Sequence, residues 1–425
     1  MDIIYGEVCL MTIETERNSQ AQANPVFMTA KTAICLMAAA DISDASTIVR
    51  CLEPENHDPL QNMTDPDVVL GNALVVETKY RTMCSLIKDS GCHVCVDLPC
   101  GYTPKALHLS KAGMRFIGLD LPIVVQEIEP IIRSLTTSSD EISFHGIDAT
   151  NYESIRTALQ NVTGPLCITT EGMMMYFDAY EADAVVSNIR AMLELHGGLW
   201  ITPDPEFVLQ FFYSFHSIFG KNSLAKLAAS KESAQQQANV TNLSNPLIIN
   251  PDDIIRSSKT AEDFINSHGM KVKKITLAEH IPTLSIYRQL TQEQIRNFKN
   301  AMNDCHYWVI TLDEHRQQTD NSEPQALPFE MNYALENNIF KASIGGRLDS
   351  LTAPQLLTAW EKIKTTCMPV GAEIDCTKLE YITSAGIRVF LIIQKALGRN
   401  LTLTNVHSSL EKLFMQKGFT VPPQR

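Results

Sequence analysis

The stretch from His93 to Asp120, HVCVDLPCGYTPKALHLSKAGMRFIGLD, decides the fold of the first three-quarters of the chain. It begins with a short apolar run, HVCVDL, and continues through the turn PCGYTP into KALHLSKAG, which has helical spacing. A second apolar run, MRFIGLD, ends in an acid. This order predicts a strand, a loop, a helix and a parallel strand. Asp120, at the tip of the second strand, is then placed to bind the hydroxyls of a ribose.

Three further strand candidates also end near an acid. The runs ISFHGIDATN, LCITTEG and GGLWITPD carry Asp148, Glu171 and Asp204 at or near their ends. Because parallel strands present their carboxyl ends at one edge of a sheet, we expect these acids and Asp120 to line the ligand-binding edge of a doubly wound α/β sheet. For each acid taken alone, a solvated carboxylate at a strand end is the alternative.

Residues 205–260 interrupt this alternation of strands and helices. Their first part, FVLQFFYSFHSIF, is rich in aromatic residues, and a polar passage follows. An insertion at this place predicts a helical lid whose aromatic side chains favour an apolar or aromatic substrate. A helix that packs its aromatic face into the core is the alternative.

The ends of the chain have a different character. Residues 1–40 are expected to be mostly helical and to cover an edge of the sheet, and residues 316–328 are polar and Pro-containing, which is typical of a linker. Residues 329–425 predict a small α/β domain, with strands in FEMNYALEN, IFKASIGGRLD, GAEIDC and NLTLTNV, a turn in TKLEYIT, and three helices. We therefore predict two domains, 1–315 and 329–425.

Composition describes a globular protein with enough apolar material for two cores. The apolar fraction is 44%, the charged fraction is 20% and the mean hydropathy is -0.06. No apolar run approaches the length of a membrane span. The first residues carry acids where a signal peptide carries bases, and the 11 Cys are scattered singly. We expect a cytoplasmic protein with no membrane partner, and we interpret Cys92, Cys95 and Cys100 as buried thiols rather than metal ligands.

The net charge of -13 is unevenly distributed. Residues 1–328 hold 24 basic and 40 acidic residues, a net charge of -16, whereas residues 329–425 hold 11 and 8, a net charge of +3. Nucleic-acid binding requires clustered Lys and Arg, and no such cluster is present. We therefore expect no nucleic-acid partner.

Residues 20–315 resemble the class I S-adenosylmethionine-dependent methyltransferases. The motifs VDLPCG, GLD, GIDATN and TTEGMMMYF, together with the insertion after the fifth strand, are similar in order and spacing to those of the leucine carboxyl methyltransferase group, which includes small-molecule O-methyltransferases. The resemblance implies a Rossmann-like sheet with S-adenosylmethionine as the cofactor.

The resemblance also assigns roles to individual residues. Gly101 lies against the methionine part of the cofactor, Asp120 binds its ribose hydroxyls and Asp148 accepts from its adenine amino group. Glu171 lies near the methionine end and the substrate cleft. Arg81, before the first strand, is the candidate partner of the cofactor carboxylate.

The loop from Asp97 to Thr103 departs from the family pattern at one position. Pro99 replaces the first glycine of the usual Gly-x-Gly, and proline has a fixed φ and no N–H to donate. The resemblance implies that this loop, Asp97 and Pro99 included, contacts the cofactor. The departure implies either a slightly shifted cofactor or a degenerate site.

Methyl transfer from a sulfonium mainly requires desolvation and alignment of the nucleophile. A carboxylate acceptor needs no base, whereas a hydroxyl acceptor benefits from one, for which Glu171, His145 and His216 are candidates. A structural hydrogen-bonding role is the alternative for each histidine.

Residues 329–419 resemble the STAS domain, the fold of anti-sigma-factor antagonists, in GRLDSLTAPQL and IDCTKLEYITSAGIRVF. In that family a Ser or Thr at the start of the helix is phosphorylated by a partner kinase. Ala385 stands at the usual acceptor position, so Ser384 and then Thr383 are the candidates, and a helix N-cap hydroxyl is the alternative for each.

These observations predict an O-methyltransferase with a carboxylate or hydroxyl acceptor, on a small molecule or a protein, fused to a domain that docks a partner such as a serine kinase. The alternative is a degenerate methyltransferase-like scaffold or ligand sensor that acts through protein contacts, which Pro99 favours.

Overall fold

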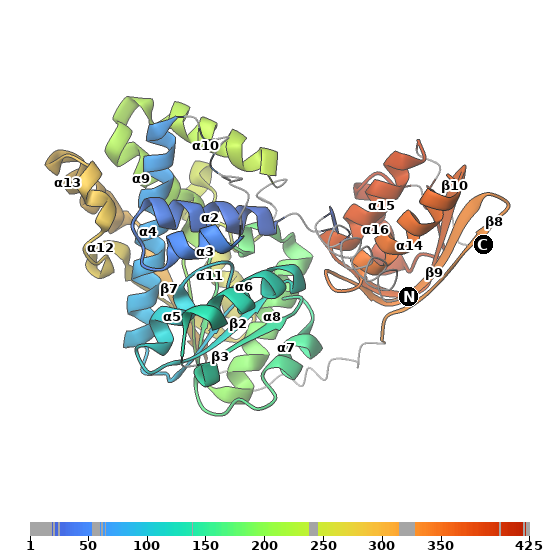
Figure 1. Cartoon of the computed structure of the whole chain (residues 1–425), viewed down its shortest axis with the longest axis horizontal. Coiled ribbons are helices and arrows are strands. Elements are labelled where there is room, and N and C mark those ends of the chain that lie inside the picture. The colour runs from blue at the N-terminus through green and yellow to red at the C-terminus, as the bar shows by residue number, and fades with distance from the viewer. Residues whose placement is uncertain are drawn as a thin grey trace, which may run out of the picture. The chain divides into compact units, whose positions relative to one another are not determined.

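The computed structural model describes residues 19, 22–23, 26–52, 60, 63, 65–137, 139–237, 245–313, 328–398, 401–419 and 421. Contacts divide the chain into two compact units. The large unit comprises Val26–Gln317, and the small unit comprises Gln318–Arg425 together with Met1–Pro25. Each unit has its own sheet (Figure 1) and its own hydrophobic core.

A seven-stranded sheet forms the centre of the large unit (Figure 1). Its order is β3-β2-β1-β4-β5-β7-β6. The first five of these strands in the order pair in parallel, whereas β7 is antiparallel to both β5 and β6. The strands are β1 Val94–Asp97, β2 Arg115–Asp120, β3 Ile142–Gly146, β4 Leu166–Thr169, β5 Gly198–Thr202, β6 Met270–Thr276 and β7 His306–Leu312.

The strand order reverses between β1 and β4, which are neighbours although β2 and β3 lie between them in the sequence. Rossmann-like sheets bind ligands outside the carboxyl ends of the strands at such a reversal. The predicted parallel, doubly wound α/β sheet is confirmed. The insertion of β7 between β5 and β6 is not evident from the sequence, because the pattern of a buried strand does not identify its neighbours.

Helices pack against this sheet along its width. Helix α6 contacts β2 and β3, α8 contacts β4, β5 and β7, and α11 contacts β6. Helix α8 begins at a capping box formed by Asp178 and Glu181. The helices of the large unit are α2 Phe27–Ala39, α3 Ala45–Leu52, α4 Pro66–Asp89, α5 Lys105–Ser110, α6 Pro122–Leu135, α7 Tyr152–Ala158, α8 Ala179–His196, α9 Phe207–Phe219, α10 Ser223–Gln237, α11 Ile254–Ser267, α12 Leu277–His280 and α13 Gln292–Ala301.

The predicted lid region contains helices α9 and α10, and residues 238–244 of it lie outside the described residues. Both helices pack against α4. Phe215 of α9 is fully buried, and a Cβ placed on Gly71 of α4 would lie 2.6 Å from its ring. Part of the aromatic run therefore packs into the core. Helix α11, which begins within the predicted lid region, covers β6.

The small unit has a four-stranded sheet in the order β11-β10-β9-β8. Strands β9, β10 and β11 are parallel, and the edge strand β8 is antiparallel to β9. The predicted strands and helices are present: β8 Glu330–Glu336, β9 Ile339–Leu348, α14 Ala353–Thr366, β10 Gly371–Ile382, α15 Ser384–Ala396, β11 Leu401–Thr404 and α16 Ser408–Gln416.

The segment TKLEYIT does not form the predicted turn. It continues strand β10 as far as Ile382, with irregularities in the pairing with β9 between Asp375 and Tyr381. Leu379 and Ile382 are buried in the core of the small unit. The sequence pattern does not predict a strand here, because the irregular register breaks the simple alternation of buried and exposed side chains and places the exposed Thr377 and Lys378 next to each other.

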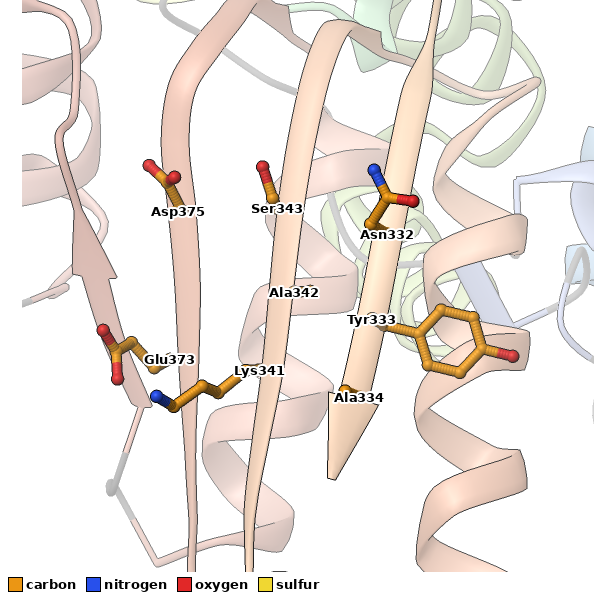
Figure 2. Close-up of a pocket in the computed structure, with 8 residues that line it drawn as sticks. All are labelled: Asn332, Tyr333, Ala334, Lys341, Ala342, Ser343, Glu373 and Asp375. Atoms are coloured by element: carbon orange, nitrogen blue, oxygen red, sulfur yellow. The ribbon is translucent and has the colours of Figure 1, made fainter. Parts of the chain in front are cut away.

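Figure 2 shows the face of this sheet that carries polar side chains. Asn332, Ser343 and Asp375 stand opposite one another on β8, β9 and β10, and Lys341 and Glu373 form the next row. These residues surround a shallow hollow of about 280 Å³. The alternate residues of β9 are buried, as expected when helices cover the other face.

The N-terminal boundary of the large unit differs from the predicted domain 1–315. Ala23 belongs to the core of the small unit, and Thr358 Oγ1 donates a hydrogen bond of 3.0 Å to Ser19 Oγ. The described residues before Val26 therefore pack with the C-terminal part of the chain, a contact across more than 300 residues that local patterns do not encode. The predicted linker 316–328 lies, apart from Pro328, outside the described residues.

None of the helices in the described ranges combines the length and the apolar character that a membrane crossing requires.

Replacement of Gly386 by Ala is expected to destabilise the small unit. A Cβ at this position of α15 would lie 2.6 Å from the Leu348 carbonyl oxygen and 2.7 Å from Ile382 Cγ1. The clash should cost about 1–3 kcal/mol and outweigh the roughly 1 kcal/mol that Ala gains over Gly in a helix. Denaturant unfolding of the full chain measures the change.

The control for this substitution is Gln355→Ala, at an exposed position of α14. It should change the unfolding free energy by less than about 0.5 kcal/mol. A stabilised Gly386→Ala variant would show that the backbone yields and that helix propensity dominates.

Candidate functional site

Five acidic residues gather where the parallel strands of the large unit end. Asp97 and Asp120 are the last residues of β1 and β2. Asp148, Glu171 and Asp204 lie two residues after the ends of β3, β4 and β5, respectively. Neighbouring strands lie about 4.8 Å apart, so Asp97 and Glu171 lie on the two sides of the reversal of strand order, the place where sheets of this kind form a ligand-binding crevice.

Asp97 is completely buried and binds a cation from its own chain. Its Oδ1 accepts from Lys105 Nζ at 2.8 Å and from Thr169 Oγ1 at 2.6 Å. Burial alone would lower the pKa of Lys105, but attraction to the Asp97 and Glu171 carboxylates outweighs burial and raises the pKa, so Lys105 is an ammonium. Lys105 is absent from the predicted site. The loop between β1 and α5 turns back on itself, which brings the first residue of the helix to the end of the strand.

Two carboxylate oxygens at this place have no hydrogen-bond donor among the described residues. They are Asp97 Oδ2 and Glu171 Oε2, and both atoms are buried. Lys105 Nζ lies 3.9 Å from Glu171 Oε2, which is an ion pair but too long for a hydrogen bond. Burial raises the pKa of Glu171, against the influence of Lys105. Buried acceptors without donors are costly, so the pair is suited to a ligand group that donates hydrogen bonds.

Asp120 holds the loop after β1. Its Oδ2 accepts from Gly101 N and its Oδ1 from Leu121 N, each at 2.7 Å. Gly101 has φ +53°, a conformation that favours glycine. Burial raises the pKa of Asp120 to about 7 although these backbone hydrogen bonds oppose it. Pro99 supplies no N–H and Cys100 N donates to the Leu119 carbonyl oxygen at 3.0 Å, so Gly101 N is the backbone donor from this loop to the Asp120 carboxylate.

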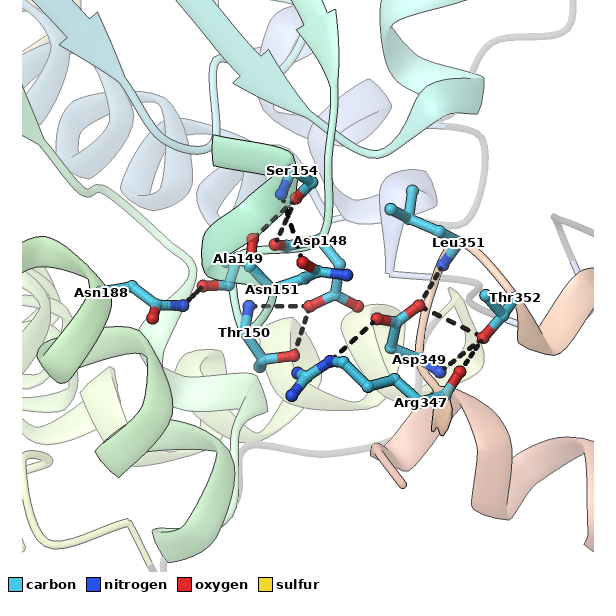
Figure 3. A network of polar contacts seen from close by, with 10 residues as sticks. All are labelled: Asp148, Ala149, Thr150, Asn151, Ser154, Asn188, Arg347, Asp349, Leu351 and Thr352. Atoms are coloured by element: carbon cyan, nitrogen blue, oxygen red, sulfur yellow. Dashed lines mark hydrogen bonds and ion pairs between the residues drawn. The ribbon is translucent and has the colours of Figure 1, made fainter. Parts of the chain in front are cut away.

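Asp148 forms a compact turn after β3 (Figure 3). Its Oδ1 accepts from Thr150 N at 2.7 Å and from Thr150 Oγ1 at 2.6 Å. Asn188 of α8 fixes the same turn, because its Nδ2 donates to the Ala149 carbonyl oxygen at 2.8 Å. The side chain of Asp148 is thus held in one position at the carboxyl end of β3.

Asp204 positions the turn that carries Glu171. Its two carboxylate oxygens accept from the backbone N–H groups of Gly172, Met173 and Met174 at 2.6–3.1 Å. The sequence predicts Asp204 at a strand end, but its role as the anchor of the next loop depends on the pairing of β4 with β5.

Arg81 lies on α4 and binds groups of its own. Its Nε donates to Glu77 Oε1 at 2.6 Å, and one terminal nitrogen donates to Ser285 Oγ at 3.0 Å. Glu77 also accepts from the backbone N–H groups of Ser285 and Ile286. These contacts join α4 to the segment after α12 and use the guanidinium of Arg81 within the fold.

Helix α2 packs over the loop that contains Gly101. Ala30 Cβ lies 3.8 Å from the position of a Cβ on Gly101, and Tyr176 OH donates to Thr29 Oγ1 at 3.0 Å. Lys31 Nζ pairs with Glu127 of α6 at 3.4 Å. Helix α2 therefore spans the loops after β1 and β4, rather than only an edge of the sheet.

The two histidines considered as bases lie in different settings. His145 is on β3, which β2 and β1 separate from β4 by about 14 Å in all. His216 is an exposed residue of α9 that stacks on Phe212. His145 therefore lies away from Glu171, the remaining candidate base at the crevice.

In the small unit, Thr383 and Ser384 begin α15. Thr383 is the N-cap residue, its N–H donates to the Leu348 carbonyl oxygen at 3.1 Å, and its side chain is only 4% exposed. Ser384 is exposed at the first helical position. Of the two hydroxyls, Ser384 is the one accessible to a kinase.

Residues after β9 border the same end of this sheet. Asp349 accepts from Leu351 N at 3.0 Å and pairs with Arg347 Nε at 3.5 Å, as Figure 3 shows. The Arg347 guanidinium also lies 3.8 Å from the centre of the Tyr381 ring. A positively charged side chain therefore occurs at the end of the sheet where α15 begins.

Comparisons with known proteins give similar solved structures only. No protein-family model matches the chain, and no curated protein sequence matches it. A Thermobifida fusca protein described as a methyltransferase is 12% identical, over 67% of this chain and 93% of that chain, with a TM-score of 0.38. Human N-acetylserotonin methyltransferase in complex with S-adenosylmethionine is 10% identical, over 65% and 69%, with a TM-score of 0.31. Magnesium protoporphyrin IX methyltransferase from Synechocystis is 12% identical, over 63% and 93%, with a TM-score of 0.32.

The raised pKa of Asp120 makes the stability of the fold depend on pH. An unfolded Asp ionises near pH 3.8, whereas in the folded chain the pKa is about 7. The neutral Asp120 carboxyl therefore makes its full contribution to the free energy of unfolding below about pH 4. This contribution is lost as the pH rises to 7, and the loss is about 4 kcal/mol at most. Relative to the wild type, Asp120→Asn should gain unfolding free energy between pH 4 and 7 and no more above pH 7.

Denaturant unfolding of both proteins at a series of pH values measures this difference. Asp252→Asn, at an exposed position, is the control and should follow the wild type at every pH. A constant difference between Asp120→Asn and the wild type would contradict the raised pKa.

Proposed function

We propose that the large unit binds S-adenosylmethionine and transfers its methyl group to an oxygen nucleophile, as a methyltransferase of the leucine carboxyl methyltransferase type. The observation that carries this proposal is the pair of buried carboxylate oxygens, Asp97 Oδ2 and Glu171 Oε2, at the reversal of strand order. They fit the ammonium group at the methionine end of this cofactor, which offers donors to both.

The other predicted residues fit the remaining parts of the cofactor. Each oxygen of Asp120 already accepts one backbone hydrogen bond and retains a lone pair for a ribose hydroxyl. Asp148 stands two strands away from β1, on the side expected for the adenine amino group. In the order of the strands β4, β1, β2 and β3, the acids Glu171, Asp97, Asp120 and Asp148 thus run from the expected methionine end to the expected adenine end.

The bound cofactor supplies a methyl group that its sulfonium already activates. The protein then has to exclude water and to align the acceptor oxygen. Helix α2 covers the loop after β1, and Tyr176 joins it to the loop after β4. For a hydroxyl acceptor, Glu171 is the candidate base, because it lies at the reversal of strand order and burial raises its pKa above the ordinary value. A carboxylate acceptor needs no base.

Binding of S-adenosylhomocysteine, measured by titration calorimetry, tests the cofactor site. We expect one site, and Asp120→Asn should weaken binding about 100-fold, because hydrogen bonds to a charged group contribute about 1.5–3 kcal/mol each. Since the ionised carboxylate is the better acceptor and its pKa is about 7, affinity for the wild type should rise roughly tenfold from pH 6 to pH 8. Asp120→Asn should lose this pH dependence.

The control is again Asp252→Asn, which should bind as the wild type does. The absence of heat with the wild type would refute the cofactor, whereas equal binding by Asp120→Asn would refute the role of Asp120 alone.

A non-catalytic scaffold or ligand sensor is the second candidate function. Pro99 favours it, because the loop has one N–H fewer than a Gly-x-Gly loop. Binding of S-adenosylhomocysteine without methyl transfer to any carboxylate or phenol in a panel would support this alternative, and turnover of any of them would reject it.

We propose in addition that the small unit is STAS-like and docks a protein partner under the control of phosphorylation at Ser384. Ser384 is exposed in the first turn of α15, where backbone N–H groups and the helix dipole favour a phosphate. The Arg347 guanidinium, paired with Asp349, lies at the same end of the sheet.

Incubation of the full chain with cell-lysate kinases, followed by mass spectrometry, should show phosphate on Ser384 and little on the buried Thr383. A chain with Ser384→Asp should then capture a different amount of partner protein than the wild type, with Ser408→Asp at the start of α16 as the control. Unmodified Ser384 together with unchanged capture would refute the switch.

A further inference from the structure

We propose that Lys79 binds the carboxylate of the ligand's amino-acid group in the large unit, the role that sequence resemblance gives to Arg81. The inference rests on the proposed function, since it concerns the same site. It assigns the carboxylate-binding role to a residue that lies outside the sequence motifs that carry the resemblance.

The surroundings of Lys79 call for an anion. The residue is on α4 and is 6% exposed. Its Nζ lies 4.9 Å from the centre of the Phe207 ring, and no ion pair within 4 Å joins it to a carboxylate of the described residues. A buried ammonium is costly unless a counter-charge is close, and a cation–π contact offsets only part of that cost.

Lys79 is anchored at the carboxyl ends of β4 and β5. Tyr307 OH donates to the Lys79 carbonyl oxygen at 3.0 Å. Phe207, the ring beneath the ammonium, directly follows the turn that contains Asp204, and Asp204 holds the loop of Glu171. Burial raises the pKa of Glu171, and the positive charges of Lys105 and then Lys79 oppose this rise.

Arg81 is directed elsewhere on the same helix. Two residues along an α-helix correspond to a rotation of about 200°, so Lys79 and Arg81 project from nearly opposite sides of α4. Arg81 already binds Glu77 and Ser285, and its side chain is 31% exposed. If Arg81 turned away to bind a ligand, Glu77 would remain buried without its cation. Lys79 could bind a ligand carboxylate without breaking an existing ion pair.

The position of Lys79 follows from the geometry of an amino-acid group. Its ammonium and carboxylate share one carbon, so a carboxylate must lie within a few ångströms of an ammonium held by Asp97 and Glu171. Lys105 is already bonded to Asp97 and lies 3.9 Å from Glu171 Oε2, whereas Lys79 acts on Glu171 through its charge alone. Lys79 is the cation that remains to receive the ligand carboxylate.

Two ligands that differ in this group test the inference. S-adenosylhomocysteine carries the carboxylate, whereas 5′-methylthioadenosine lacks the whole amino-acid group. We expect Lys79→Gln to weaken S-adenosylhomocysteine about tenfold or more in calorimetry and to leave 5′-methylthioadenosine within about twofold of the wild type. Lys79→Arg should restore the affinity, and Lys88→Gln, at an exposed position of the same helix, is the matched control and should bind both ligands as the wild type does.

The carboxamide of S-adenosylhomocysteine provides a second measurement. The wild type and Lys79→Arg should discriminate against it about tenfold, and Lys79→Gln should not. Unchanged S-adenosylhomocysteine binding by Lys79→Gln, or an equal loss for both ligands, would overturn the assignment while leaving the cofactor site in place. Failure of the wild type to bind either nucleoside would instead refute the proposed function.

Discussion

The buried ion pair between Asp97 and Lys105 fixes the geometry on which the site depends. It joins the end of β1 to the start of α5, and Thr169 extends the link to β4. Breaking such a pair by removing one partner typically costs about 3–5 kcal/mol, because the other charge remains buried. The loop between the two residues is therefore held in a narrow turn, and that turn presents Gly101 N to Asp120. Loss of the pair would disturb the loop before it affected the sheet.

Local patterns in the sequence were sufficient for the parallel sheet and its acids. Asp97, Asp120, Asp148, Glu171 and Asp204 each lie within two residues of a strand end, and period and turn residues are local signals. Lys105 and Lys79 could not be found in this way. Lys105 is the first residue of a helix and Lys79 is in the middle of one, so only the folded loop and the packing of α4 show where their ammonium groups lie.

Contacts between distant parts of the chain account for the other differences. Ala23 packs in the small unit and Ala30 beside Gly101, although only six residues separate them. The hydrophobic periodicity of the sequence does not show that these two residues pack in different units. The continuation of β10 through TKLEYIT has the same origin, because its pairing with β9 determines which of its residues are buried. The lid, the role of Arg81 and the STAS resemblance stay predictions. Their tests require a bound ligand or a partner protein.

Unmatched buried groups of opposite charge give the strongest physical constraint on what the crevice can hold. Asp97 Oδ2 and Glu171 Oε2 are buried acceptors without donors among the described residues, and Lys79 is a buried cation with no carboxylate of the described residues within 4 Å. A ligand with a single charge could compensate only one of these two sides. An amino-acid group carries one charge of each sign. It also supplies donors to Asp97 Oδ2 and Glu171 Oε2 and an acceptor to Lys79, so the charges and the hydrogen bonds favour the same zwitterionic ligand group.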